Sequence, residues 1–124
     1  MTYTGDQLPT WCGEDEWCPM VATSIILGRK WHPVIIQRLL EHGTLRFGEL
    51  KNLIPEVSGK VLSESLTDLE EKGLVERSVT NDKPIEVKYS LTHYGQKLEG
   101  AITELHAWGR EYLMEALSPE ESII

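Results

Sequence analysis

The 124-residue sequence predicts one mainly α-helical domain that carries a single two-stranded β-hairpin. Three patterns support this fold class. Apolar residues recur at steps of three and four between residues 20 and 73, which is the spacing of amphipathic helices. The pattern changes to partial alternation between residues 74 and 91, which is typical of strands. A last long stripe with helical spacing follows Thr92.

Three short helices are expected first. Residues 20–28 (MVATSIILG) and 31–43 (WHPVIIQRLLEHG) each end in a glycine, a residue that favours helix termination. Residues 46–54 (RFGELKNLI) follow, with four apolar side chains on one face, and Pro55 ends the segment. The chain therefore begins with helices joined by tight connections.

A fourth helix is expected to start after Ser58, because serine is a favourable N-cap residue. Gly73 is expected to end it. The apolar stripe of this helix, which we expect to be buried, consists of Val61, Leu62, Leu66 and Leu69.

A β-hairpin and one long helix complete the expected fold. Residues 74–80 and 85–91 contain β-branched and aromatic residues, and the turn cluster NDKP separates them. Thr92 is expected to cap a helix that ends near Leu117. Three glycines within this helix suggest close packing, more readily against a partner helix than against water. The apolar stripe of the helix is Leu98, Ile102, Leu105, Trp108, Tyr112 and Leu113.

The net charge of −8 is unevenly distributed along the chain. Residues 1–28 carry four acids and no base, residues 29–97 carry eleven bases and ten acids, and residues 98–124 carry six acids and one base. An acidic composition is thus compatible with a basic face on the central region, since local potential attracts phosphate. A second interpretation is adaptation to a salty cytoplasm, and composition alone does not separate the two.

Several functional classes lack support in the sequence. There is no stretch of eighteen apolar residues and no secretory signal pattern, so we expect a soluble, cytoplasmic protein that does not enter the membrane. No phosphate-binding glycine loop, HExxH motif or recognisable nucleophile with its base is present, and we expect neither an enzyme nor a cofactor. The histidines lack metal-ligand spacing, so no metal site and no role are assigned to His32, His42, His93 and His106.

The order helix, short turn, helix and hairpin is the layout of a winged helix-turn-helix domain. Several motifs in this order resemble the HxlR-type transcriptional regulators of the MarR-like group: LGRKW at 27–31, RFGEL at 46–50, SGKVLSESLTDLEEKGLVER at 58–77 and YSLTHYG at 89–95. The resemblance extends from Cys18 to about Tyr112.

The resemblance implies a homodimeric regulator that binds double-stranded DNA at a pseudo-palindromic operator. The first and last helices would form the dimer interface, through Leu98, Ile102, Leu105, Trp108 and Tyr112. Trp31 is expected in the core or at the dimer contact. The domain is expected to span residues 18–117, between an acidic arm at 1–17 and a tail at 118–124. A winged-helix module that binds proteins instead of DNA is the alternative.

Candidate DNA contacts fall into two groups. The helix after Ser58 would enter the major groove and read bases with small polar side chains and one lysine. Thr67 stands where the family usually has arginine or lysine, which suggests greater reliance on DNA shape and phosphate contacts. The first group is Ser58, Gly59, Lys60, Ser63, Glu64 and Thr67; the second, expected to contact phosphates or merely to balance nearby acids, is Arg46, Lys51, Arg77, Lys83 and Lys88.

Both cysteines lie in the stretch WCGEDEWCP at residues 11–19. Five residues separate Cys12 from Cys18, which is wider than the usual spacing of zinc-ligand pairs. A redox switch and a pair of inert thiols remain as alternatives. A helix N-terminus beside Cys18 would favour the reactive thiolate, whereas the acids at 14–16 would oppose it. The resemblance implies a sensing role for Cys18 in some members.

Overall fold

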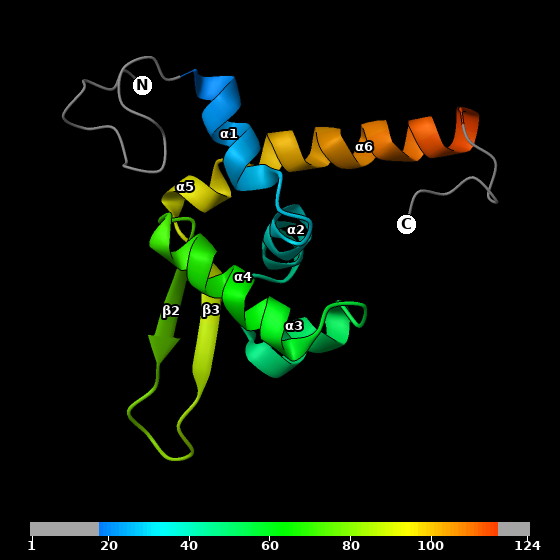
Figure 1. Ribbon diagram of the computed structural model, residues 1–124. Helices are drawn as coiled ribbons and strands as arrows, with labels where there is room; N and C mark the ends of the chain where they lie inside the picture. Colours follow the sequence, from blue (N-terminus) through cyan, green and yellow to red (C-terminus); the bar gives the residue numbers. More distant parts are fainter. Residues whose placement is uncertain (1–17, 117–124) are drawn as a thin grey trace.

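The computed structural model describes residues 18–116, which form five helices and a three-stranded antiparallel sheet, together with one further four-residue helical turn (Figure 1). In chain order the elements are α1 (Pro19–Leu27), α2 (His32–His42), β1 (Leu45–Arg46), α3 (Phe47–Leu53), α4 (Gly59–Glu71), β2 (Val75–Val79), β3 (Val87–Leu91), α5 (His93–Gln96) and α6 (Glu99–Glu115). This order confirms the winged helix-turn-helix layout predicted from the sequence.

The core lies where α2, α3 and α4 meet the sheet. Its fully buried members include Ile36, Leu39 and Leu50. Leu66 and Leu69 of α4 face the same cluster and are almost completely buried. Because α4 is packed against this cluster along one side, its opposite side is held facing the solvent.

The sheet contains one strand that the sequence did not predict. β2 and β3 form the expected hairpin, with Val75 opposite Leu91 and Val79 opposite Val87. β1, only two residues long, pairs with the other edge of β3, so the strand order is β1-β3-β2. The outer part of the hairpin projects away from the helices as a wing (Figure 1).

The long helix predicted after Thr92 is two helices, which corrects the sequence expectation. α5 ends at Gln96, and α6 begins at Glu99 in a different direction (Figure 1). Thr92 caps α5 by accepting a hydrogen bond from the N–H of Gly95 at 3.2 Å. The break allows α5 to pack against the end of the sheet while α6 crosses α2. One straight helix could not make both sets of contacts.

The predicted role of the glycines in this region is correct only in part. A Cβ atom added to Gly95 would collide with the backbone oxygen of Leu74, so the close packing occurs within the chain and not against a partner helix. A Cβ atom at Gly100 or Gly109 would meet nothing within 4 Å. Of the three, only Gly95 is required by the fold of the protomer.

The buried stripe of α4 also differs from the expected one. Val61 is 37% exposed and lies outside the core, whereas Ser65 is buried with Leu62, Leu66 and Leu69. The buried positions are thus spaced three, four and seven residues from Leu62, which is a complete helical stripe without Val61. Within residues 18–116, no helix is long and apolar enough to cross a membrane.

Candidate nucleic-acid interface

α3 and α4 form the helix-turn-helix, and Ser58 fixes where the second helix begins. The Ser58 hydroxyl oxygen accepts a hydrogen bond from the N–H of Val61 at 3.1 Å, which satisfies one of the free donors of the first turn. At the other end, Gly73 adopts a positive φ of 76° that glycine allows at low cost. The limits of α4 therefore follow directly from its sequence.

The solvent-facing side of α4 carries the base-reading candidates. Lys60 has 86% of its side chain exposed and lies 4.0 Å from Glu64, an ion pair too long and too exposed to hold it in place. Gly59 has open space around its Cα. The structure brings these residues together on one exposed surface with Ser58, Ser63, Glu64 and Thr67. We call this surface the α4 face.

The wing is closed at its base by hydrogen bonds between Thr80 and Glu86. The N–H of Thr80 donates to the Glu86 carbonyl, and the N–H of Glu86 donates to the Thr80 hydroxyl, each at 2.9 Å. Lys83 lies in the exposed loop beyond this closure, and Arg77 is exposed on β2. Among residues 18–116, neither base forms an ion pair, so both are available to phosphate groups.

Two of the bases expected to contact phosphates, Arg46 and Lys88, take part in a charge network with nearby acids. Arg46 contacts Glu49 and Glu86, each at 3.3 Å, and Lys88 lies 3.6 Å from the second oxygen of Glu86. The Arg46 N–H also donates to Glu49 at 2.8 Å. These hydrogen bonds lower the pKa of the Glu49 carboxyl, and Glu49 in turn raises the pKa of Arg46.

This network has as many acids as bases. The interpretation that Arg46 and Lys88 balance nearby acids therefore fits them better than a role as unpaired phosphate contacts. Lys51 is intermediate: it is half-buried on α3 and donates to the Pro55 carbonyl at 3.5 Å, a contact that leaves its charge uncompensated.

A buried polar cluster that sequence reasoning missed connects α4 to the end of α1. His32 is fully buried, and its Nδ1 lies 2.8 Å from the carbonyl oxygen of Ile26. A carbonyl only accepts, so Nδ1 carries the hydrogen. Its Nε2 faces the Asp68 carboxylate at 3.4 Å, and Lys72 contacts the other oxygen of Asp68 at 2.6 Å. Burial lowers the pKa of His32, although Ile26 and Asp68 oppose the shift.

The cluster could not be found from spacing, because His32 and Asp68 lie 36 residues apart and meet only in the folded chain. It gives His32 a structural role where none was assigned. Through it, the position of α4 is coupled to the connection between α1 and α2.

Exposed apolar side chains lie along α1 and α6, away from the α4 face. The predicted dimer residues separate into two sets. Ile102 is buried in the protomer core and Leu98 packs against it, whereas Leu105, Trp108 and Tyr112 are exposed by 51%, 64% and 39%. The rings of Trp108 and Tyr112 stack with centroids 5.0 Å apart. Trp31, by contrast, packs against the core.

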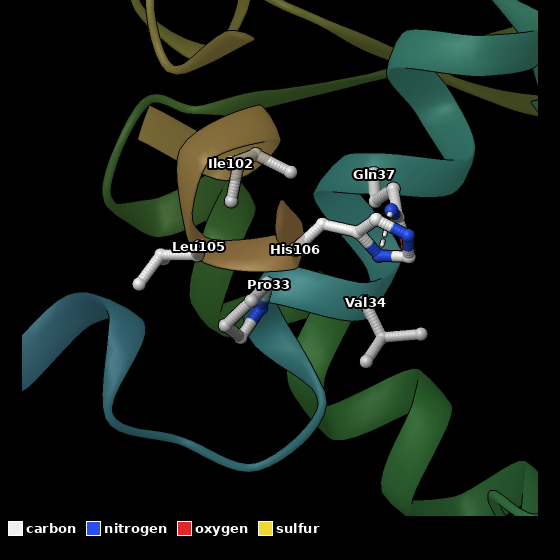
Figure 2. A pocket seen from close by; sticks show the side chains of 6 residues that line it. All are labelled: Pro33, Val34, Gln37, Ile102, Leu105 and His106. Atoms are coloured by element: carbon white, nitrogen blue, oxygen red, sulfur yellow. Dashed lines mark hydrogen bonds between the residues drawn. The ribbon is translucent and has the colours of Figure 1, made fainter. Parts of the chain in front are cut away.

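Two grooves border these side chains. A cavity of about 670 Å³ between α1 and α6 is lined by Met20, Leu27 and Trp108 among others. A smaller one of about 200 Å³ lies between α2 and α6, where Gln37 and His106 form a 3.3 Å hydrogen bond (Figure 2). Leu105 borders both cavities. Apolar surface is thus continuous from α1 across α6.

Cys18 is a free, exposed thiol immediately before α1, where it occupies the N-cap position. Its carbonyl accepts the first hydrogen bond of the helix from Ala22 at 2.9 Å. Cys12 lies outside the described residues, as do the acids at 14–16, so a role for the two cysteines in a redox switch stays a prediction.

Comparison with known proteins identifies the family. The sequence model of the HxlR-like helix-turn-helix family matches residues 26–117. The chain is 38% identical over 103 residues to YtcD of Bacillus subtilis, an uncharacterized HTH-type transcriptional regulator, covering 83% of this chain and 81% of the relative.

Solved structures agree with this assignment. The reduced form of the B. subtilis transcriptional regulator YodB superposes with a TM-score of 0.70 at 35% identity, covering 83% of this chain and all of the other. The redox regulator HypR in its reduced form gives a TM-score of 0.72 at 30% identity, covering 77% and 93%. From the matched motifs, the shared fold and these relatives, we conclude that the chain belongs to the HxlR-like helix-turn-helix family.

Proposed function

We propose that the protein is a transcriptional regulator that binds double-stranded DNA through α4 and the wing. The observation that carries the proposal is the α4 face: a helix anchored by its buried side, with small polar residues and Lys60 exposed at its N-terminal end. Recognition helices of this fold contact base edges with their N-terminal residues. The family membership and the names of the relatives support DNA binding over a protein-binding module.

We further propose that two copies bind together, with the exposed apolar side chains of α1 and α6 forming the contact. A monomer would leave Leu105, Trp108 and Met20 in water, which favours covering them with a second copy. A two-fold dimer would present two α4 helices to a pseudo-palindromic operator, with half-sites about 34–36 Å apart. Of the predicted contacts, Ile102 would support this surface from beneath.

The position of Cys18 supports a response to oxidants or electrophiles. The thiol is exposed and lies at the start of α1, one of the two helices of the proposed dimer contact. A chemical change at this point would alter how α1 packs, and the polar cluster of His32 and Asp68 links the end of α1 to α4. One structural relative is a redox regulator, which is consistent with this proposal.

The function is tested by measuring retention of a duplex that contains the DNA upstream of the protein's own gene, against a scrambled duplex of equal length. We expect binding that weakens as salt rises, and an altered sequence preference for Lys60→Ala or Ser63→Ala. The matched control is Lys97→Ala, which removes an exposed lysine between α5 and α6. Equal affinity for both duplexes would reject sequence-specific regulation, and no binding to either would favour the protein-binding alternative.

A further inference from the structure

One apolar side chain, that of Val61, borders the polar α4 face. Val61 is 37% exposed, and it is the only large apolar residue of α4 that reaches the surface to this extent. It lies in the first turn of the helix, where its N–H bonds to Ser58. Of the two residues before it, Gly59 has no side chain, and Lys60 is 86% exposed.

Isolated exposed apolar residues are common and usually have no function. Val61 differs because of what α4 lacks. The helix, GKVLSESLTDLEE, contains no arginine, asparagine or glutamine, which are the side chains that form most of the paired hydrogen bonds with guanine and adenine. Only Lys60 remains for guanine. Sequence-specific recognition of DNA by this helix therefore depends on contacts other than paired hydrogen bonds.

Major-groove recognition also uses apolar contact with the C5-methyl group of thymine. The two methyl groups of Val61 are suited to that contact, and its location in the first turn is where recognition helices of this fold reach base edges. Ser58 and Ser63 are short, so the helix can approach the base edges closely enough for a short valine side chain to reach them.

We propose that Val61 contacts the methyl group of a thymine in each operator half-site, and so contributes to operator specificity through an apolar contact. The proposal rests on the proposed function, since it requires α4 to enter the major groove. It also predicts that the operator has a thymine at a symmetric position in each half-site.

The test starts from a duplex selected by the purified protein from a random-sequence library. Each thymine is then replaced by uracil, which removes the methyl group and leaves base pairing intact. Burying one methyl group corresponds to about a fourfold change in affinity, and two half-sites to about fifteenfold. We expect a loss of this size for wild-type protein when the one symmetric thymine pair is replaced.

The Val61→Ala variant should bind the thymine duplex more weakly and should lose its sensitivity to uracil at that pair. The control is Lys97→Ala, which truncates an exposed side chain between α5 and α6, outside α4 and the wing, and should keep the uracil sensitivity. The inference is overturned if no thymine pair is sensitive, or if Val61→Ala keeps the wild-type pattern. If the selection enriches no sequence at all, the proposed DNA-binding function fails, and this contact fails with it.

Discussion

Replacing Gly95 with alanine should destabilise the protein strongly. Gly95 is buried in α5, where the chain approaches the end of the sheet. An added methyl group would collide with the Leu74 carbonyl oxygen and lie 2.9 Å from Cδ2 of Leu91. Neither obstacle moves easily, because the Leu74 carbonyl accepts a 3.0 Å hydrogen bond from Thr92 and Leu91 is part of the core.

The same substitution at Gly100 provides the control. Gly100 also lies in a helix, but a Cβ atom there meets nothing within 4 Å. It points away from the protomer core, since it is two residues from the buried Ile102 and a residue turns about 100° around the helix. Alanine at this position should stabilise α6 by up to about 1 kcal/mol.

The two substitutions should therefore have opposite signs. Overpacking of this kind costs about 1–3 kcal/mol, so we expect Gly95→Ala to lower the free energy of unfolding by about 2 kcal/mol. With a urea m-value of about 2 kcal/mol/M, the midpoint would fall by about 1 M. The assay is urea unfolding followed by circular dichroism at one fixed protein concentration, which is needed because dimers unfold in a concentration-dependent way.

The reasoning is refuted if Gly95→Ala unfolds at the wild-type midpoint or above it. In that case the close approach of α5 to the sheet would not be a requirement of the fold. Equal destabilisation by Gly100→Ala would instead show that the glycine face of α6 is covered by something in the native assembly, as the sequence alone suggested.

Four further predictions follow from the site. Trp108→Glu should convert the proposed dimer to a monomer in light scattering at micromolar concentration, and a wild-type monomer would contradict the proposed contact. Diamide should change DNA affinity in wild type but not in Cys18→Ser; unchanged wild-type affinity after verified thiol oxidation would exclude the switch. Lys83→Ala should reduce the salt slope of DNA binding by about one, and Lys97→Ala should leave it unchanged. Burial lowers the pKa of His32, so the free energy of unfolding should fall as the pH drops below the unfolded-state pKa of about 6.5. The His32→Gln variant should show a flatter dependence of stability on pH in this range. A wild-type slope in the variant would exclude His32 as its source.

Local signals in the sequence predict much of this fold. Ser58 and Thr92 cap helices, because each side-chain oxygen reaches a free N–H three residues ahead, and Gly73 provides the positive φ that ends α4. Such features depend on neighbours in the chain. They can therefore be identified from residue type and spacing alone.

The features that were missed depend on distant parts of the chain. β1 is a strand only because Leu45 and Arg46 pair with β3 more than 40 residues later. The break before α6 arises because α5 and α6 pack on different elements. Val61 was assigned to the core because valine is apolar, and a helical projection with Ser65 in the stripe would have placed it at the surface.

Nonlocal contacts of the same kind distinguish two groups among the predicted site residues. The residues of the α4 face share one helix, so their common exposure follows from the helical period. Arg46 and Lys88 are adjacent across β1 and β3, and Glu86 lies between them in space. The sequence offered balancing by nearby acids as an alternative, but it could not show which acid each base pairs with, because that pairing depends on the register of the sheet.

Hydroxyl-radical footprinting on a selected duplex tests the central claim most directly, because it maps where the protein lies on the DNA. Two α4 helices of a two-fold dimer should protect two symmetric regions whose centres are about 10 base pairs, or one helical turn, apart. Ala substitution of Ser63 should weaken binding without changing this spacing. A single asymmetric protected region, or uniform cleavage at protein concentrations that saturate the duplex, would contradict a dimeric regulator that reads DNA through α4.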